Sequence, residues 1–152
     1  MEHKAIKLVL KEKTTFDLYF LDGKVIRYDI LSLIDKFPQL NELKNRELFL
    51  KGKLLGYGGL SWNDELDIDS ETVYLEGKDV TNEYDDILNV VIGYKIKEKR
   101  LERNTTQEQL SKLTGIDQSD ISKIEKGLAN PTIKQIQRIV NKLESKLAIS
   151  IK

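Results

Sequence analysis

Cysteine is absent from this 152-residue sequence, and histidine occurs once, as His3. The lack of cysteine excludes a disulfide framework, thiolate metal ligands and a thiol nucleophile together. Long apolar runs are also missing, since no stretch approaches the roughly 20 residues that a membrane-spanning helix needs. The first residues, MEHKAIKLVLKEK, lack the apolar core and the cleavage site of a secretory signal. We therefore expect a soluble, cytoplasmic protein.

Signatures of catalysis and of metal binding are missing as well. The glycine-rich stretch 56–59 lacks the Lys-Ser or Lys-Thr step and the following helix of a phosphate-binding loop, so a turn between strands is favoured. The acidic stretch 64–71 lacks the central glycine and the spaced final glutamate of a calcium loop, which favours a solvated loop. Nothing in the sequence makes Asp67 and Asp69 converge in a cleft. We expect no enzymatic activity, no metal and no cofactor.

Charge and aromatic content both divide the sequence near residue 85. Residues 1–84 hold 12 Lys and Arg against 16 Asp and Glu, whereas residues 85–152 hold 13 against 9. Every Phe, Trp and Tyr lies at or before Tyr94. Such asymmetry within a chain of zero net charge indicates one part that faces nucleic acid and another that does not. We expect two domains, at residues 1–80 and 86–152.

The pattern of residues 1–80 is typical of a small α+β domain. Strands are expected at residues 5–11, 15–21 and 24–28. Asp22-Gly23 supplies the tight turn that a hairpin between the last two needs. Asp29 should cap a short helix over 30–36, which Pro38 stops. The further expected elements are a helix at 40–43, strands at 47–55, 60–62 and 72–75, and a polar linker at 77–86.

Residues 86–115 predict two amphipathic helices. The first runs from about 86 to 104, and its apolar face is expected to hold Leu88, Ile92, Ile96 and Leu101. Thr106 is a good cap for the second helix, which would turn Leu110 and Leu113 inward. Gly115 can end that helix, because glycine adopts the left-handed conformation of a helix terminus without strain.

A third helix is expected at 118–126 and a fourth after Thr132. Asp117 should cap the third, with Ile121 and Ile124 on its buried face and polar residues outward. A helix, a short turn with glycine and a second helix make the bihelical unit whose second helix enters the DNA major groove.

The stretch TQEQLSKLTGIDQSDISKIEKGLANPT resembles the signature of the Cro/repressor-like, or xenobiotic-response-element, family of helix-turn-helix domains. The resemblance covers roughly residues 90–143 and implies an all-α, lambda-repressor-like domain that binds double-stranded DNA. Three packing positions depart from the family pattern: Thr105 and Thr114 stand where Leu is usual or frequent, and Ser111 replaces a common Ala. Residues 5–77 resemble a small bacterial α+β domain family of unknown function, which implies an accessory role in dimerisation or partner binding.

The third helix carries the residues for which the resemblance implies contact with DNA bases: Gln118, Ser119 and Lys123. A Gln amide can bind an adenine edge through two hydrogen bonds, and a Lys ammonium group can reach guanine. A solvated helix face is the alternative for each of them, because not every outward residue touches a base. Asp120 could accept a hydrogen bond from cytosine, but its place in the first turn favours a role in stabilising the helix terminus.

The resemblance also implies contacts with DNA phosphates, which give affinity and register but carry no sequence information. The candidates are Gln107 at the start of the second helix, and Ser122, Lys126 and Asn130 in or after the third. A further implication is a partly buried ion pair between Arg100 and Glu125.

Residues 143–152, LESKLAISIK, alternate Leu147, Ile149 and Ile151 with polar residues, which is a strand pattern. A strand cannot satisfy its own backbone, so this one needs either the amino-terminal sheet or the same strand of a second copy. Pairing between copies would give a homodimer whose twofold symmetry fits palindromic DNA sites. The expected fold class is α+β, a small α+β domain followed by an all-α lambda-repressor-like domain with a terminal β-strand.

These features favour a sequence-specific transcriptional regulator, most simply a dimeric repressor that reads DNA with helix 118–126. The alternative is an antitoxin-like module, in which the acidic amino-terminal domain neutralises a partner protein and the DNA-binding domain autoregulates the operon. Ligand sensing by the amino-terminal domain is a third hypothesis, for which the sequence offers no specific residues. An enzyme is the least favoured interpretation.

Overall fold

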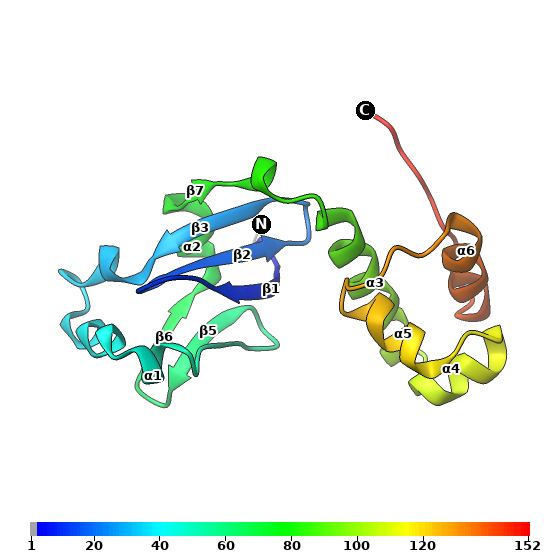
Figure 1. Cartoon of the computed structure of the whole chain (residues 1–152), viewed down its shortest axis with the longest axis horizontal. Coiled ribbons are helices and arrows are strands. Elements are labelled where there is room, and N and C mark those ends of the chain that lie inside the picture. Colours follow the sequence, from blue (N-terminus) through cyan, green and yellow to red (C-terminus); the bar gives the residue numbers. More distant parts are fainter. Residues whose placement is uncertain (1–2) are drawn as a thin grey trace. The chain divides into compact units, whose positions relative to one another are not determined.

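The computed structural model describes residues 3–152, which divide into two compact units with a boundary between Ile87 and Leu88. The first unit holds two antiparallel sheets with short helices, and the second holds four helices (Figure 1). The α+β class predicted from the sequence is confirmed. Within residues 3–152 no helix is both long enough and apolar enough to span a membrane.

The larger sheet of the first unit has the strand order β1-β2-β3-β7. Its strands are β1 (Ala5–Leu10), β2 (Thr15–Phe20), β3 (Val25–Asp29) and β7 (Lys78–Asp79). Gly23 adopts a φ of +90° in the turn between β2 and β3, a conformation that glycine reaches without steric cost. The predicted hairpin and the three predicted strands are therefore present, each within a residue or two of its expected bounds.

The smaller sheet has the order β4-β5-β6. Its strands are β4 (Lys53–Leu54), β5 (Gly59–Asn63) and β6 (Leu66–Asp69). The strand predicted at 47–55 is mostly wrong, because helix α1 (Arg46–Phe49) occupies its first third and only Lys53–Leu54 is a strand. The Asn45 side chain accepts hydrogen bonds from the backbone N–H groups of the first turn and so starts that helix. The loop predicted in the acidic stretch is also wrong, since β6 lies there with Leu66 buried.

The strand predicted at 72–75 is helix α2 (Ser70–Glu76). Asp69 caps this helix by accepting the Glu71 N–H, and Val73 is buried on its inner face. Capping and burial override the β-propensity of the Thr-Val-Tyr-Leu sequence.

The helix predicted at 30–36 is a shorter 3-10 turn, η1 (Ile30–Leu33). Pro38 begins a second 3-10 turn, η2 (Pro38–Lys44), at a position where its missing N–H costs nothing.

The segment predicted as a linker, 77–86, is packed onto the first unit. It contains β7 and a 3-10 turn, η3 (Thr81–Glu83). The Tyr84 hydroxyl donates to the buried carboxylate of Asp17, which also accepts from Arg27 Nε at 2.9 Å. The Tyr19 hydroxyl donates to Asp86 at 2.8 Å, and burial together with this bond raises the pKa of Tyr19. The linker prediction is wrong because Tyr84 and Asp86 form hydrogen bonds with side chains of the sheet and Val80 is buried.

The second unit consists of α3 (Ile87–Glu102), α4 (Gln107–Thr114), α5 (Gln118–Glu125) and α6 (Ile133–Lys142). Its core cluster comprises Ile96, Leu110, Ile116, Ile121, Ile124, Ile139 and Leu143. The predicted apolar face of the first helix is partly wrong, since Leu88 and Leu101 are 69% and 56% exposed. Leu113, predicted to face inward, is 51% exposed. The helices are where the pattern predicts them, and Leu110 is buried as expected, but α3 buries Val90, Gly93, Ile96 and Arg100 in place of its leucines.

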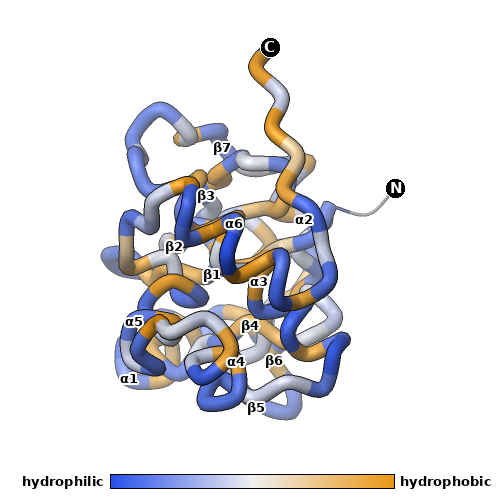
Figure 2. The backbone as a smooth tube through the Cα atoms, turned by 90° about the vertical axis from the view of Figure 1, so that its right-hand side faces the viewer, coloured by the Kyte–Doolittle hydropathy of each residue, from blue (hydrophilic) through white to orange (hydrophobic). Residues whose placement is uncertain are grey.

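The predicted terminal strand is not formed. Residues 145–152 have no regular secondary structure, and Ile149 and Ile151 are 64% and 95% exposed. Figure 2 shows hydrophobic stretches along this segment where it leaves the helices. A strand needs a partner for its backbone N–H and C=O groups, and no strand within residues 3–152 pairs with this segment.

Candidate DNA interface

The start of α4 and the turn into α5 are fixed by local hydrogen bonds. Thr106 and Gln109 form a capping box, in which each side chain accepts the backbone N–H of the other residue, at 3.0 and 2.9 Å. Gly115 ends α4 with a φ of +73°. Asp117 precedes α5 as predicted, but its side chain makes no capping hydrogen bond, so its predicted role is wrong. Its backbone carbonyl accepts the Asp120 N–H instead, at 3.0 Å.

Two departures from the family pattern are hydrogen-bonded within this turn. The buried Thr114 hydroxyl donates to the Leu110 carbonyl at 2.7 Å and accepts the Ile116 N–H at 3.2 Å. The Ser111 hydroxyl donates to the Ile116 carbonyl at 2.6 Å. Both polar side chains therefore satisfy backbone groups of the turn that sets the angle between α4 and α5.

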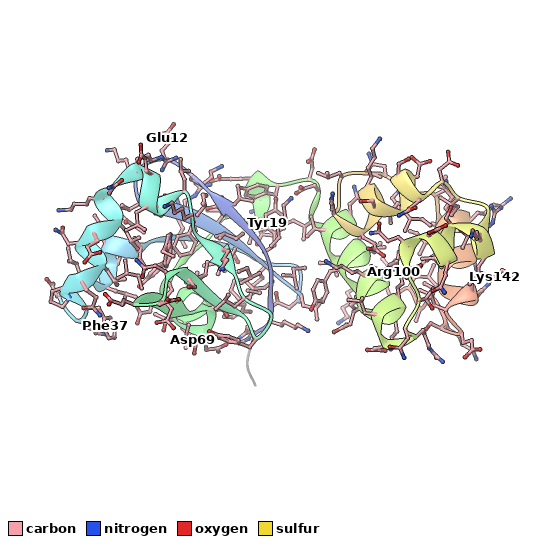
Figure 3. All side chains as sticks on the ribbon, turned by 90° about the horizontal axis from the view of Figure 1, so that it is seen from below. Glu12, Tyr19, Phe37, Asp69, Arg100 and Lys142 are labelled. Atoms are coloured by element: carbon pink, nitrogen blue, oxygen red, sulfur yellow. The ribbon has the colours of Figure 1, made fainter. Side chains whose placement is uncertain are left out.

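Arg100 lies on α3 (Figure 3) and forms a bidentate ion pair with Glu125 on α5. The Arg100 Nε–Glu125 Oε1 and Nη2–Oε2 distances are 2.5 and 3.0 Å, and the two side chains are 9% and 2% exposed. Arg100 Nη1 also donates to the Thr105 carbonyl at 2.9 Å. Gln107 Nε2 donates to Glu125 Oε2 at 2.8 Å. One carboxylate on α5 thus holds side chains of α3 and α4.

Two glycines bring α3 against the end of α5. A Cβ atom built on Gly93 would lie 2.1 Å from the Ile124 carbonyl oxygen, and one on Gly127 would lie 2.8 Å from Val90 Cα. Gly127 also has a φ of +71°. A side chain at either position would push the helices apart. We did not predict this role, although a glycine inside a helical pattern, as at Gly93, is a signal for close packing.

The outer face of α5 is polar and open. Gln118, Ser119 and Lys123 are exposed, Ser122 is half-buried, and Asp120 is exposed in the first turn. The opposite face buries Ile121, Ile124 and Glu125. The structure therefore brings the predicted base-contacting residues together on one accessible helix face with a rigid foundation.

The residues predicted to contact phosphates differ in their exposure and in their hydrogen-bond partners. Lys126 is exposed after α5. Gln107 is half-buried, and its amide is engaged by Glu125. The Asn130 side-chain oxygen accepts a hydrogen bond from Asn89 on α3. Sequence spacing could not reveal these partners, because each hydrogen bond joins residues from different parts of the domain.

Residues 96–149, which span the end of α3 through α6, match the model of a helix-turn-helix family. The Cro/repressor-like resemblance predicted from the sequence is therefore confirmed for this part of the chain, and the match supports a DNA-binding regulator in general. No curated protein matches the sequence. A crystal structure of a candidate DNA-binding protein from Nitrosomonas europaea shares 14% identity with a TM-score of 0.45, over 91% of this chain and 85% of that one. A likeness of this strength supports no conclusion of its own.

Proposed function

We propose that this protein is a sequence-specific repressor that acts in the cytoplasm as a dimer and reads the DNA major groove with α5. The observation that carries the proposal is the division of α5 into two faces. Its outer face presents Gln118, Ser119 and Lys123 to solvent, while its inner face is fixed by Ile121, Ile124 and the Glu125 ion pair.

Each outward residue of α5 can form a hydrogen bond with a DNA base. Gln118, in the first turn of α5, has an amide that can bind the N6 and N7 edge of adenine. Lys123 can reach guanine O6 or N7, and Ser119 can bond to any base edge nearby. Because helix-turn-helix proteins insert the beginning of the recognition helix, Gln118 and Ser119 should lie deepest in the groove.

Phosphate contacts would fix the register of the domain on the duplex. Lys126 supplies an exposed ammonium group, and the half-buried Ser122 supplies a hydroxyl. Gln107 stands at the amino terminus of α4, where backbone N–H groups and the helix dipole attract a phosphate. Asn130 would join these contacts from the loop after α5. A dimer so placed would cover two half-sites about one helical turn apart and exclude other proteins from the promoter.

The proposal is tested by selecting duplexes from a random-sequence pool with the full chain. The selected duplex and a scrambled one are then titrated by fluorescence anisotropy. We expect Gln118→Ala to lose about 1–3 kcal/mol of discrimination between the two duplexes. The matched control is Gln137→Ala, since Gln137 is also exposed but lies on α6. Failure to select any sequence, or equal discrimination by both variants, would rule out base reading by α5.

A further inference from the structure

The outer edge of β6 is unpaired and opens on a cavity. In the smaller sheet β6 pairs with β5, and no other strand within residues 3–152 pairs with its second edge. A cavity of about 560 Å³ is lined by three consecutive residues of this strand, Asp67, Ile68 and Asp69, among others. Neighbouring residues of a strand point to opposite faces, so a cavity lined by all three must run along the strand's edge.

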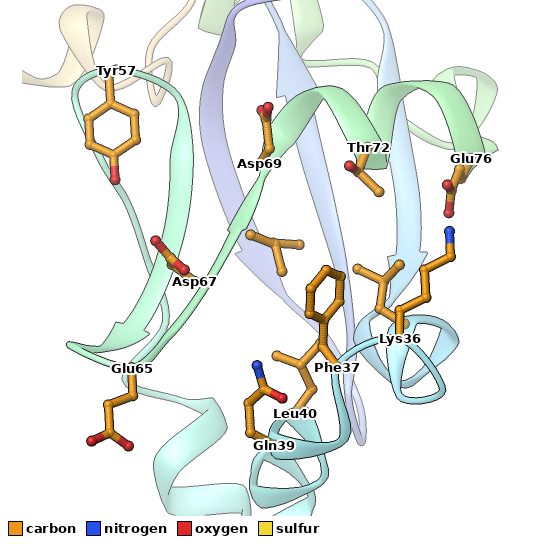
Figure 4. Close-up of a pocket in the computed structure, with 12 residues that line it drawn as sticks. Lys36, Phe37, Gln39, Leu40, Tyr57, Glu65, Asp67, Asp69, Thr72 and Glu76 are labelled. Atoms are coloured by element: carbon orange, nitrogen blue, oxygen red, sulfur yellow. The ribbon is translucent and has the colours of Figure 1, made fainter.

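The cavity has an apolar floor and an acidic rim (Figure 4). Leu33 and Leu40 are buried beneath it, and Phe37 borders it with 47% of its surface exposed. Four carboxylates line it, against one ammonium group, that of Lys36. In Figure 4 the Lys36 side chain is directed towards Glu76 and away from Asp67. Of the two carboxylates on β6, Asp69 accepts the Glu71 N–H at 2.9 Å, whereas Asp67 forms no ion pair with any residue that the structure describes.

The segment 146–152 has the complementary pattern. Its odd positions, Leu147, Ile149 and Ile151, are apolar, and its even positions include Lys146 and Lys152. As a strand it would carry an apolar face and a basic face. Beside β6, these faces would align with Ile68 on one side of the sheet and with Asp67 and Asp69 on the other.

The segment 146–152 and the outer edge of β6 have complementary features. The segment has a strand pattern but no strand, and its isoleucines are among the most exposed apolar residues of the second unit. The outer edge of β6 has no strand partner among residues 3–152 and lies above an apolar floor. Acidic side chains on an edge oppose indiscriminate pairing but admit a basic strand. The other outer strands fit less well, because β4 and β7 have two residues each and β1 packs against β4.

We propose that residues 146–152 of one copy add as a strand to the edge of β6 in a second copy. Reciprocal exchange closes a twofold dimer in which each copy gives one strand and receives one. The inference deepens the proposed function, on which its dimer rests, by naming the surfaces that hold the two copies together. Strand addition supplies backbone hydrogen bonds for affinity and alternate side chains for specificity.

Analytical ultracentrifugation of the full chain and of three variants tests this surface. We expect twice the 17.5 kDa chain mass for the full chain, and the single-chain mass for a variant that lacks residues 146–152 and for Asp67→Lys. Asp64→Lys is the matched control, because Asp64 is exposed next to β6 but does not line the cavity. Combining Asp67→Lys with Lys146→Glu and Lys152→Glu should restore the dimer. A full chain that is monomeric at every concentration, or a tail-deleted chain that stays dimeric, overturns the proposal.

Cross-linking identifies which copies pair. Because the sequence has no cysteine, Asp67→Cys and Ser150→Cys can be made in separate chains, mixed and treated with a short bismaleimide. We expect a product of double mass that requires both chains. An intrachain product in the double variant with none in the mixture would place the strand on its own copy and overturn the proposal. Selection of a DNA sequence by the tail-deleted chain reports on base reading separately, so the two proposals can fail independently.

Discussion

At the scale of single residues, Glu125 is the group on which the helix-turn-helix depends most. Its carboxylate is 2% exposed and accepts hydrogen bonds from both Arg100 and Gln107. A buried ion pair adds little net stability compared with apolar packing, but removing one partner leaves the other charge buried without compensation. The residue pair was predictable from the family resemblance, whereas the part played by Gln107 was not.

Glu125→Ala should lower the free energy of unfolding by about 3–5 kcal/mol, because the Arg100 guanidinium then lies buried without its carboxylate. The control is Glu144→Ala, which breaks the Arg103–Glu144 pair whose side chains are 43% and 79% exposed. Exposed pairs contribute about 1 kcal/mol or less. Urea unfolding of both variants measures the difference, and equal midpoints would contradict the structural role of Glu125.

Thr114→Val should lower the free energy of unfolding by about 1–3 kcal/mol, since it keeps the shape of the side chain but leaves the Ile116 N–H without its acceptor. Thr105→Val serves as the control, because the half-buried Thr105 hydroxyl makes one hydrogen bond of 3.2 Å, to the Arg103 carbonyl. A stabilised Thr114→Val variant would contradict this role of the Thr114 hydroxyl and show that an apolar side chain suits the position better.

At the scale of elements, the chain shows which features periodicity and capping can predict. The helices of the second unit were predictable because Thr106, Gly115 and Thr132 mark their ends. The rotation of α3 was not, since its inner face holds Gly93 and Arg100, which a count of apolar residues overlooks. In the first unit, Asn45 starts a helix where a strand was predicted, and Asp69 starts one that contains the Thr-Val-Tyr sequence of high β-propensity.

Gly93→Ala tests the packing of α3 on α5. Within an exposed helix this change stabilises by about 0.5–1 kcal/mol. Here the added methyl group would meet the Ile124 carbonyl oxygen, so we expect a lower melting temperature and weaker DNA binding. Leu101→Ala, at a position on the same helix that is 56% exposed, should change neither. A Gly93→Ala variant that melts at a higher temperature than the parent would contradict the close approach of the two helices.

At the scale of the whole molecule, the net charge of zero is the sum of an acidic part and a basic part. The acidic residues are concentrated before residue 85 and the basic excess lies after it, in the part that matches the helix-turn-helix family. The sequence alone predicts this division, because the net charge of each part follows from a count of its charged residues. It could not predict the cavity beside β6, which requires η2, α2 and β6 to come together from separate stretches.

The dependence of DNA binding on salt reports the contacts with phosphates. Lys126→Ala should weaken binding to selected and scrambled duplexes alike, and should reduce the slope of log affinity against log salt by about one. Lys112→Ala is the control, because Lys112 is exposed on α4 and lies within reach of Glu108 at 3.4 Å. An unchanged slope for Lys126→Ala would show that Lys126 does not contact a DNA phosphate.

The central claim is that the outer face of α5 reads bases, and anisotropy titration of the full chain tests it most directly. A selected duplex and its scrambled counterpart are titrated with the parent and with Gln118→Ala at two salt concentrations. Base reading predicts tight binding to the selected duplex and a loss of discrimination in the variant that persists at both salt concentrations. Equal binding of both duplexes by the parent would contradict the claim and leave α5 as a surface for another partner.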